Sequence, residues 1–286
     1  MTPRERVRRA VLFEGPDRVP RSLPEPWGSD IKMVGVGPNP DWRPAREGED
    51  EWGCVWAKLR KDETHGQCIG HPLDDYGKLE TYRFPRFDLD ARFENAARSV
   101  ADNPDEKFVL GFIPLSFIHR LEYLRGHVEA WTDPVEYPEQ LDTLLTKLGD
   151  IAITCMNRMA DLGVDGIFSC DDWGLQDRPM VSPAVFREHF QPHYARVYQA
   201  ARDRGLLCFL HSCGYIIDLI DPLIDAGLHV IQQDQQENMG VDALADRYGG
   251  RICFWCPVDI QKTMVAGAAE QIRDYARHMN ERFGAC

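Results

Sequence analysis

The residues with the clearest capacity for chemistry are His211 and Cys213, which form an H-x-C motif at the end of the apolar run 206–211. If this run is a strand, residues i and i+2 point to the same side, so the imidazole and the thiol converge. That pair suits a tetrahedral zinc site with an open position, provided that a further ligand comes from elsewhere. A core cysteine beside a hydrogen-bonded histidine is the alternative. The position before Gly214 at a strand end favours the metal.

A C-x-x-C pair, Cys253 and Cys256, offers the third zinc ligand. A redox C-x-x-C lies at a helix N-terminus, whereas this pair lies along an apolar run, where residues three apart face opposite sides. Only one of the two thiols can therefore face the site. We predict that it is Cys256, which is nearer to the carboxyl end of the run, and that Cys253 is a packing residue. Cys286, Asp172 or Glu237 could close the site instead.

An acidic pair, Asp171 and Asp172, follows the apolar run 165–170. Acidic pairs at strand ends are commonly turn or helix-capping residues. The functional alternative makes Asp172 the catalytic acid or base and places Asp171 and Trp173 against the substrate. Glu25 is a further candidate for substrate binding.

The elements that must position these groups alternate regularly after residue 107. The apolar runs are 108–114, 165–170, 206–211, 229–233 and 251–255, and a first strand is expected at 19–24. Amphipathic stretches lie between the later runs, and strands that alternate with helices imply a parallel sheet with right-handed crossovers. In such a sheet the reactive groups lie at the carboxyl ends of the strands, where all three motifs are found.

Capping residues indicate where the helices begin and end. The first expected helix begins at the Thr2/Glu5 capping box. Three later helices are expected from Asp133-Pro134 to Gly163, from Ser182-Pro183 to Gly205, and from about Ala268 to Phe283.

We therefore expect an α/β fold, a (β/α)8 TIM-type barrel, formed by one domain over residues 1–286. Six strands are counted where a closed barrel needs eight, so the expected barrel is either shortened at its C-terminal end or completed in another way. Residues 28–107 have weak periodicity and are rich in Gly, Pro, Trp and charge. We expect them to form an irregular excursion that covers the site.

Composition excludes several classes of function. The 286 residues include 46 acidic and 33 basic side chains, and a net charge of -13 disfavours binding to nucleic acid or to an anionic membrane. No apolar run approaches the roughly 20 residues of a membrane span, and the N-terminus does not resemble a secretory signal. The nine cysteines are odd in number and widely spread, so we expect them to be reduced, in the cytoplasm.

The sequence resembles the uroporphyrinogen decarboxylase superfamily, and most specifically its corrinoid-linked methyltransferase branch. The matching stretches are residues 2–20, 171–194, 210–235 and 249–261. The resemblance implies a (β/α)8 barrel whose methyltransferase members hold zinc through H-x-C and a distant cysteine. That zinc activates a thiol, which exchanges a methyl group with a corrinoid cobalt.

The chain departs from the family pattern in two informative places. The arginine-rich motif resembling R-Q-A-G-R-Y after the first strand is absent, and RSLPEPWGSD stands at 21–30, which weakens the case for binding a porphyrinogen with four carboxylates. Position 256 is often glycine in the resembling proteins, so Cys256 as a ligand rests on strand geometry alone.

The resulting hypothesis is a zinc-dependent methyltransferase that moves a methyl group between a corrinoid cobalt and a thiol or other small acceptor. Its expected cofactors are zinc and a methylcorrinoid carried by a partner protein, and a homodimer is left open. A metal-free decarboxylase, with Asp172 handling the proton and His211 as a donor, is the alternative. A non-catalytic corrinoid-protein partner is a third class.

Overall fold

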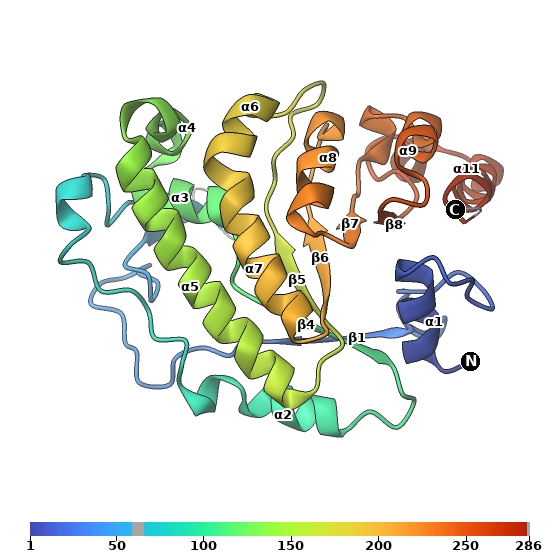
Figure 1. Cartoon of the computed structure of the whole chain (residues 1–286), viewed down its shortest axis with the longest axis horizontal. Coiled ribbons are helices and arrows are strands. Elements are labelled where there is room, and N and C mark those ends of the chain that lie inside the picture. Colours follow the sequence, from blue (N-terminus) through green and yellow to red (C-terminus); the bar gives the residue numbers. More distant parts are fainter. Residues whose placement is uncertain (59–65, 285–286) are drawn as a thin grey trace.

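The computed structural model describes residues 1–58 and 66–284, and its centre is a parallel sheet of six strands (Figure 1). The strands are β1 (Ile31–Gly35), β4 (Phe108–Phe112), β5 (Gly166–Cys170), β6 (Leu207–His211), β7 (Val230–Gln232) and β8 (Cys253–Trp255). They lie side by side in chain order, each parallel to the next. Sequential parallel strands joined by helices are the arrangement of a TIM-type α/β fold.

The sheet is strongly curved, because side chains from strands that are not neighbours meet on its inner face. The rings of Phe108 on β4 and Phe209 on β6 lie 5.7 Å apart, as do those of Phe168 on β5 and Trp255 on β8. Between β1 and β8 the sheet is open, with no pairing among the described residues.

Helix α1 (Pro3–Val11) packs into the amino-terminal end of this curved sheet. Thr2 accepts a hydrogen bond from the Glu5 N–H at 3.2 Å, which confirms the predicted start of the helix. Its buried residues Val7 and Val11 contact a cluster of inward-facing side chains: Phe108, Leu110, Leu207, Phe209 and Val230. The chain thus fills the inner face at this end with apolar side chains and leaves the carboxyl end for other groups.

Helices follow the strands and surround the sheet. They are α2 (Glu94–Ala101), α3 (Phe117–Arg125), α4 (His127–Glu136), α5 (Pro138–Leu162), α6 (Pro183–Val185), α7 (Gln191–Asp203), α8 (Ile217–Ala226), α9 (Val241–Tyr248), α10 (Thr263–Ala266) and α11 (Ala269–Phe283). In Figure 1, α5, α7 and α8 lie side by side over the sheet. None of the described helices combines the length and apolar character needed to cross a bilayer.

The five apolar runs after residue 107 are confirmed as strands β4 to β8, but the first expected strand is wrong. Residues 19–24 contribute only an isolated bridge, from Ser22 to Ser29. The first strand of the sheet is β1, inside the region expected to be irregular. Two prolines in the expected strand, Pro20 and Pro24, have no N–H to donate to a ladder.

The rest of the region 28–107 holds a separate antiparallel hairpin, β2 (Val55–Ala57) with β3 (Gln67–Gly70). It lies against α3, because the thiols of Cys54 and Cys68 donate to the carbonyl oxygen of Tyr123 at 3.2 and 3.6 Å. The region therefore covers α3, the helix that follows the first crossover of the sheet.

The predicted starts of two further helices are confirmed. Ser182 caps α6 through the Val185 N–H at 3.2 Å, and the last helix, α11, starts within one residue of the expected place. The start at Asp133-Pro134 is wrong, since both residues lie inside α4. Asp133 is instead buried in an ion pair with Arg125, with an N–O distance of 2.8 Å.

Candidate functional site

Register across the sheet determines which side chains share the carboxyl edge. Cys170 on β5 pairs with His211 on β6, His211 pairs with Gln232 on β7, and Gln232 pairs with Trp255 on β8. Residues in register on parallel strands face the same side, so this row of four lies on the inner face. The row contains a thiol, an imidazole and an amide above the apolar interior.

Asp172, His211 and Cys213 bring a carboxylate oxygen, an imidazole nitrogen and a sulfur within 4.8 Å of one another. The His211 Nε2 lies 3.2 Å from the Cys213 Sγ and 3.4 Å from the Asp172 Oδ1. The Cys213 N–H donates to the same carboxylate oxygen at 2.8 Å, which ties the loop after β5 to the loop after β6. The predicted convergence of His211 and Cys213 is confirmed, and Asp172 joins them.

Two glycines allow these loops to approach so closely. The Gly174 N–H donates to the Cys213 carbonyl at 3.1 Å, and the Tyr215 N–H donates to the Leu175 carbonyl at 2.7 Å. A Cβ on Gly214 would lie 2.2 Å from the carbonyl oxygen of Gly174, and the φ of Gly214 is +78°. Only glycine fits both the space and the left-handed backbone.

Gln232 fixes the orientation of His211. Its side-chain amide donates to the Asp234 carboxylate at 2.6 Å, which turns its Oε1 toward the His211 Nδ1. The Nδ1 is therefore the protonated nitrogen in the neutral imidazole, and the Nε2 offers its lone pair to the cluster. A hydrogen bond at the far nitrogen of this kind is the usual support of a metal-binding histidine.

The charges of the cluster are coupled. Burial lowers the pKa of His211, but hydrogen bonds to Asp172 and Cys213 outweigh that effect and raise it to about 10. Burial also raises the pKa of Asp172, while the hydrogen bonds from His211 and the Cys213 N–H bring it below its ordinary value. The site thus holds an anion beside a cation, and a metal ion would take the place of the proton that His211 holds.

The donor set fits zinc. Imidazole nitrogen, thiolate sulfur and carboxylate oxygen are all zinc ligands, and three protein ligands with an open position are typical of catalytic rather than structural zinc. The side chain of Asp172 is 36% exposed and that of His211 is 15% exposed, so solvent reaches the cluster.

Sequence reasoning missed His119 and Gln232, both of which contact the cluster or its members. The His119 Nε2 lies 3.6 Å from the Asp172 Oδ2, and its ring stacks on Tyr123. Gln232 is the last residue of β7 and His119 lies in the first turn of α3, after β4, so a search of polar side chains at and just beyond every strand end would have found them.

Aromatic rings lie beside the cluster on the inner face. The ring of Phe168 contacts Phe112 at 6.0 Å and Trp255 at 5.7 Å, and Phe112 is 40% exposed. These three rings, from β4, β5 and β8, form an aromatic wall on the inner face; Phe168 and Trp255 also pack against the apolar cluster under α1, and solvent reaches the wall at Phe112.

The prediction that Asp171 binds substrate is wrong. Its carboxylate is fully buried and accepts hydrogen bonds from the N–H groups of Phe117 and Ile118 at 2.6 and 3.0 Å, at the start of α3. The hydroxyls of Ser116 and Tyr194 also donate to it. Asp171 is therefore a helix cap, which is the alternative that the sequence left open.

Trp173 and Glu25 are also placed away from the cluster. Trp173 is fully buried, donates its indole N–H to the Tyr194 hydroxyl at 3.0 Å, and packs against Phe186 and Phe190, so it is a core residue. Glu25 is exposed in the turn that precedes β1, at the end of that strand opposite to the carboxyl edge.

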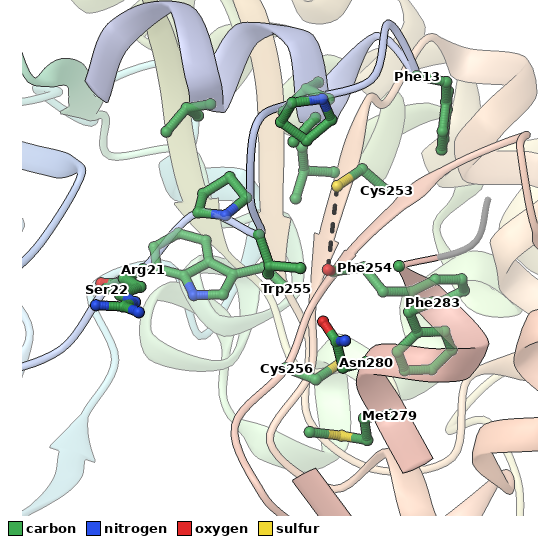
Figure 2. Close-up of a pocket in the computed structure, with 18 of the residues that line it drawn as sticks. Phe13, Arg21, Ser22, Cys253, Phe254, Trp255, Cys256, Met279, Asn280 and Phe283 are labelled. Carbon is green, nitrogen blue, oxygen red and sulfur yellow. Dashed lines mark hydrogen bonds between the residues drawn. The ribbon is translucent and has the colours of Figure 1, made fainter. Parts of the chain in front are cut away.

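Cys256 does not join the cluster, so the prediction that it is the third ligand is wrong. Trp255 takes the inward position of β8 in register with Gln232, and Cys256 lies instead near Asn280 and Met279 of α11 (Figure 2). It lines a mostly apolar cavity of about 340 Å³ between α1, β8 and α11. Burial raises the pKa of its thiol.

The carboxylate of Asp172, rather than the thiol of Cys256, lies with His211 and Cys213. Glu237 accepts a hydrogen bond from the Tyr275 hydroxyl at 2.7 Å and is not part of the donor cluster. Cys286 lies outside the described residues. The described part of the site therefore has one carboxylate, one imidazole and one thiol as its donors.

The two comparisons by sequence point to one family. The sequence model of the uroporphyrinogen decarboxylase family matches residues 74–285. A uroporphyrinogen decarboxylase from Mycolicibacterium paratuberculosis is 32% identical over 82 residues, which are 29% of this chain and 22% of that protein. A methyltransferase from Methanosarcina mazei has a similar structure, with a TM-score of 0.71 and 17% identity over 98% of this chain and 90% of that chain. At this identity the structural similarity establishes the fold alone.

Proposed function

Because the chain belongs to the uroporphyrinogen decarboxylase family, we propose that it is a zinc-dependent methyltransferase of that family. It would move a methyl group between a corrinoid cobalt and a thiol or other small acceptor. The observation that carries the proposal is the convergence of the donor atoms of Asp172, His211 and Cys213 within 4.8 Å. Nitrogen, sulfur and oxygen donors with an open position are the ligands of catalytic zinc.

The chain's own residues hold and shape this site. His211 and Cys213 present their donors from the end of β6, and Asp172 presents its carboxylate from the loop after β5. Gln232 keeps the Nε2 of His211 directed at the ligand position. Zinc held there would lower the pKa of a substrate thiol from about 8.5 and so supply a thiolate nucleophile near neutral pH.

The aromatic wall supports the binding of a large planar group carried by a partner protein. Phe112, Phe168 and Trp255 form an apolar surface on the inner face, where Trp255 is in register with Gln232, and Phe112 is exposed. We assign this surface to the corrin ring of a methylcorrinoid carried by a partner protein, which would bring its cobalt toward the substrate thiol. We place the reaction in the cytoplasm, where the eight described free cysteines would stay reduced.

The test is zinc binding joined to methyl transfer. Zinc-reconstituted protein should bind about one equivalent and accelerate methyl transfer from methylcobalamin to 2-mercaptoethanol. Cys213→Ser should weaken zinc binding by more than about 100-fold, because even residues behind the ligands commonly contribute 10- to 100-fold. Cys256→Ser is the matched control and should stay within about twofold of the unmodified protein. Less than about a tenth of an equivalent of zinc after reconstitution would contradict the proposal.

The second candidate is a metal-free decarboxylase. The contact of His211 Nε2 with Asp172 Oδ1 at 3.4 Å supports it, since such a pair could hand a proton to a carbanion left after loss of CO2. The two candidate functions differ in whether they need the thiol of Cys213. Activity that survives Cys213→Ala and is lost in Asp172→Asn would favour the decarboxylase.

A further inference from the structure

We propose that Arg120, on α3, binds an oxyanion of the small substrate, and that this group is a carboxylate. The inference deepens the proposed function, on which its assignment to the substrate rests. Arg120 follows His119, which contacts the cluster, but its own side chain points to the hairpin region that covers α3. Its surroundings are those of a cation that lacks its anion.

The guanidinium of Arg120 is held by rings rather than by carboxylates. Its central carbon lies 4.1 Å from the ring centroid of Trp52 and 5.5 Å from that of Tyr123. Both contacts are cation–π contacts, which fix the plane of the guanidinium without using its N–H groups. Burial lowers the pKa of Arg120, and among the described residues no carboxylate lies within ion-pair distance to offset that cost.

Other buried arginines of this chain show what a satisfied guanidinium looks like. Arg6 pairs with Asp30 at 2.7 Å, Arg125 pairs with Asp133 at 2.8 Å, and Arg92 pairs with Glu51. The Nε of Arg120 is buried without a partner, and so is that of Arg92. The difference lies in the terminal nitrogens: those of Arg92 donate to Glu51 and to a carbonyl oxygen, whereas those of Arg120 donate to no described residue. Arg120 is half-buried as a whole and its terminal nitrogens are not among the fully buried unpaired atoms, so solvent reaches them.

The carboxylate of Asp50, whose charge acts on Arg120, is already occupied. Its oxygens accept from the N–H groups of Trp52 and Cys54 and from the indole of Trp56, each at 2.9 Å. It therefore cannot turn to Arg120 without leaving three donors unpaired. A carboxylate from outside the chain can satisfy Arg120 through two parallel N–H···O bonds, which is the geometry that a guanidinium offers.

Contacts through α3 connect Arg120 to the cluster. The ring of Tyr123 stacks on His119 at 6.2 Å and also contacts Arg120, so it lies between the two. His119 in turn contacts Asp172. A substrate anchored at Arg120 by one end would therefore run along Tyr123 and His119 toward the donor cluster. One cation suits one carboxylate, and not a substrate with four.

The test uses two probes of equal size, propionate and the neutral propionamide, titrated into the full chain by calorimetry. Propionate should bind at one site and propionamide should not, and Arg120→Gln should weaken propionate binding at least tenfold. Arg178→Gln, which removes an exposed arginine, is the control and should leave binding unchanged. Phosphate in place of propionate identifies the preferred oxyanion, and phosphate that binds more tightly overturns the carboxylate assignment.

A second measurement does not depend on any variant. Phenylglyoxal should modify Arg120 in the unmodified chain, and propionate should protect it, as read by mass spectrometry with Arg178 as the unprotected reference. Equal modification with and without propionate, or no modification of Arg120, would overturn the inference. Zinc content separates the two proposals. If Arg120→Gln binds zinc but no form of the protein binds propionate, only this inference is refuted. If the chain binds propionate but takes no zinc, only the proposed function is refuted.

Discussion

A cysteine follows both β6 and β8, but the first has polar neighbours and the second has mostly apolar ones. After β6, the Cys213 sulfur lies 3.2 Å from an imidazole nitrogen and in a cluster with a carboxylate. After β8, Cys256 lies in a mostly apolar cavity beside α11, and Trp255 takes the inward position in register with Gln232. A cysteine alone does not define a metal site. The residues on the neighbouring strands define it, and the strand register determines which of those residues lie next to the cysteine.

The largest effect is expected on stability, where the loop after β5 and the loop after β6 approach each other at Gly214. Gly214→Ala should lower the free energy of unfolding by about 3 kcal/mol or more, because it combines a positive φ with a Cβ 2.2 Å from a backbone oxygen. Gly205 is the matched control, since its φ is +73° with nothing within 4 Å of the added Cβ. Gly205→Ala should cost only about 1 kcal/mol. Urea unfolding measures both, and equal losses would contradict the close approach of the loops.

A smaller effect concerns the support of His211. Gln232→Ala removes the acceptor at Nδ1 and should weaken zinc binding by about 10- to 100-fold. The ligands themselves remain, so the zinc stoichiometry should not change. Gln140→Ala, on the exposed face of α5, is the control. Competition with a chelator gives both affinities, and an unchanged affinity in Gln232→Ala would mean that the amide does not orient the imidazole.

The smallest effect is expected at the end of β8. Burial holds the pKa of Cys256 above its ordinary value, so alkylation by iodoacetamide at pH 8 should be slow and should keep rising with pH past about 8.5, where an ordinary thiol levels off. Zinc should protect Cys213 and change the rate at Cys256 by less than about twofold. Peptide mass spectrometry follows both thiols, and strong zinc protection of Cys256 would contradict its placement away from the metal site.

The sequence was informative wherever the signal was local. The apolar runs, the Thr2 and Ser182 caps and the convergence of His211 with Cys213 depend on residues a few positions apart, and the structure confirms them. The choice of Cys256 failed because it needed the register of β8 against β7. Register depends on side chains from both strands and on their packing, which one strand does not reveal.

The acidic pair shows the same limit at shorter range. Asp171 and Asp172 are neighbours in the chain, yet one caps α3 and the other faces the donor cluster. Leaving a strand, successive side chains point to opposite sides, so one of the two had to turn away from the site. Which one turned depended on where α3 begins, about fifty residues earlier, and on the place of Tyr194.

X-ray absorption of the zinc-loaded chain counts the sulfur ligands of the metal directly. The arrangement of Asp172, His211 and Cys213 predicts one sulfur at about 2.3 Å, with the remaining ligands nitrogen or oxygen at about 2.0–2.2 Å. The sulfur should disappear in Cys213→Ser and persist in Cys256→Ser. Two sulfur ligands, with one lost in each variant, would contradict the account by placing both strand ends at one metal ion.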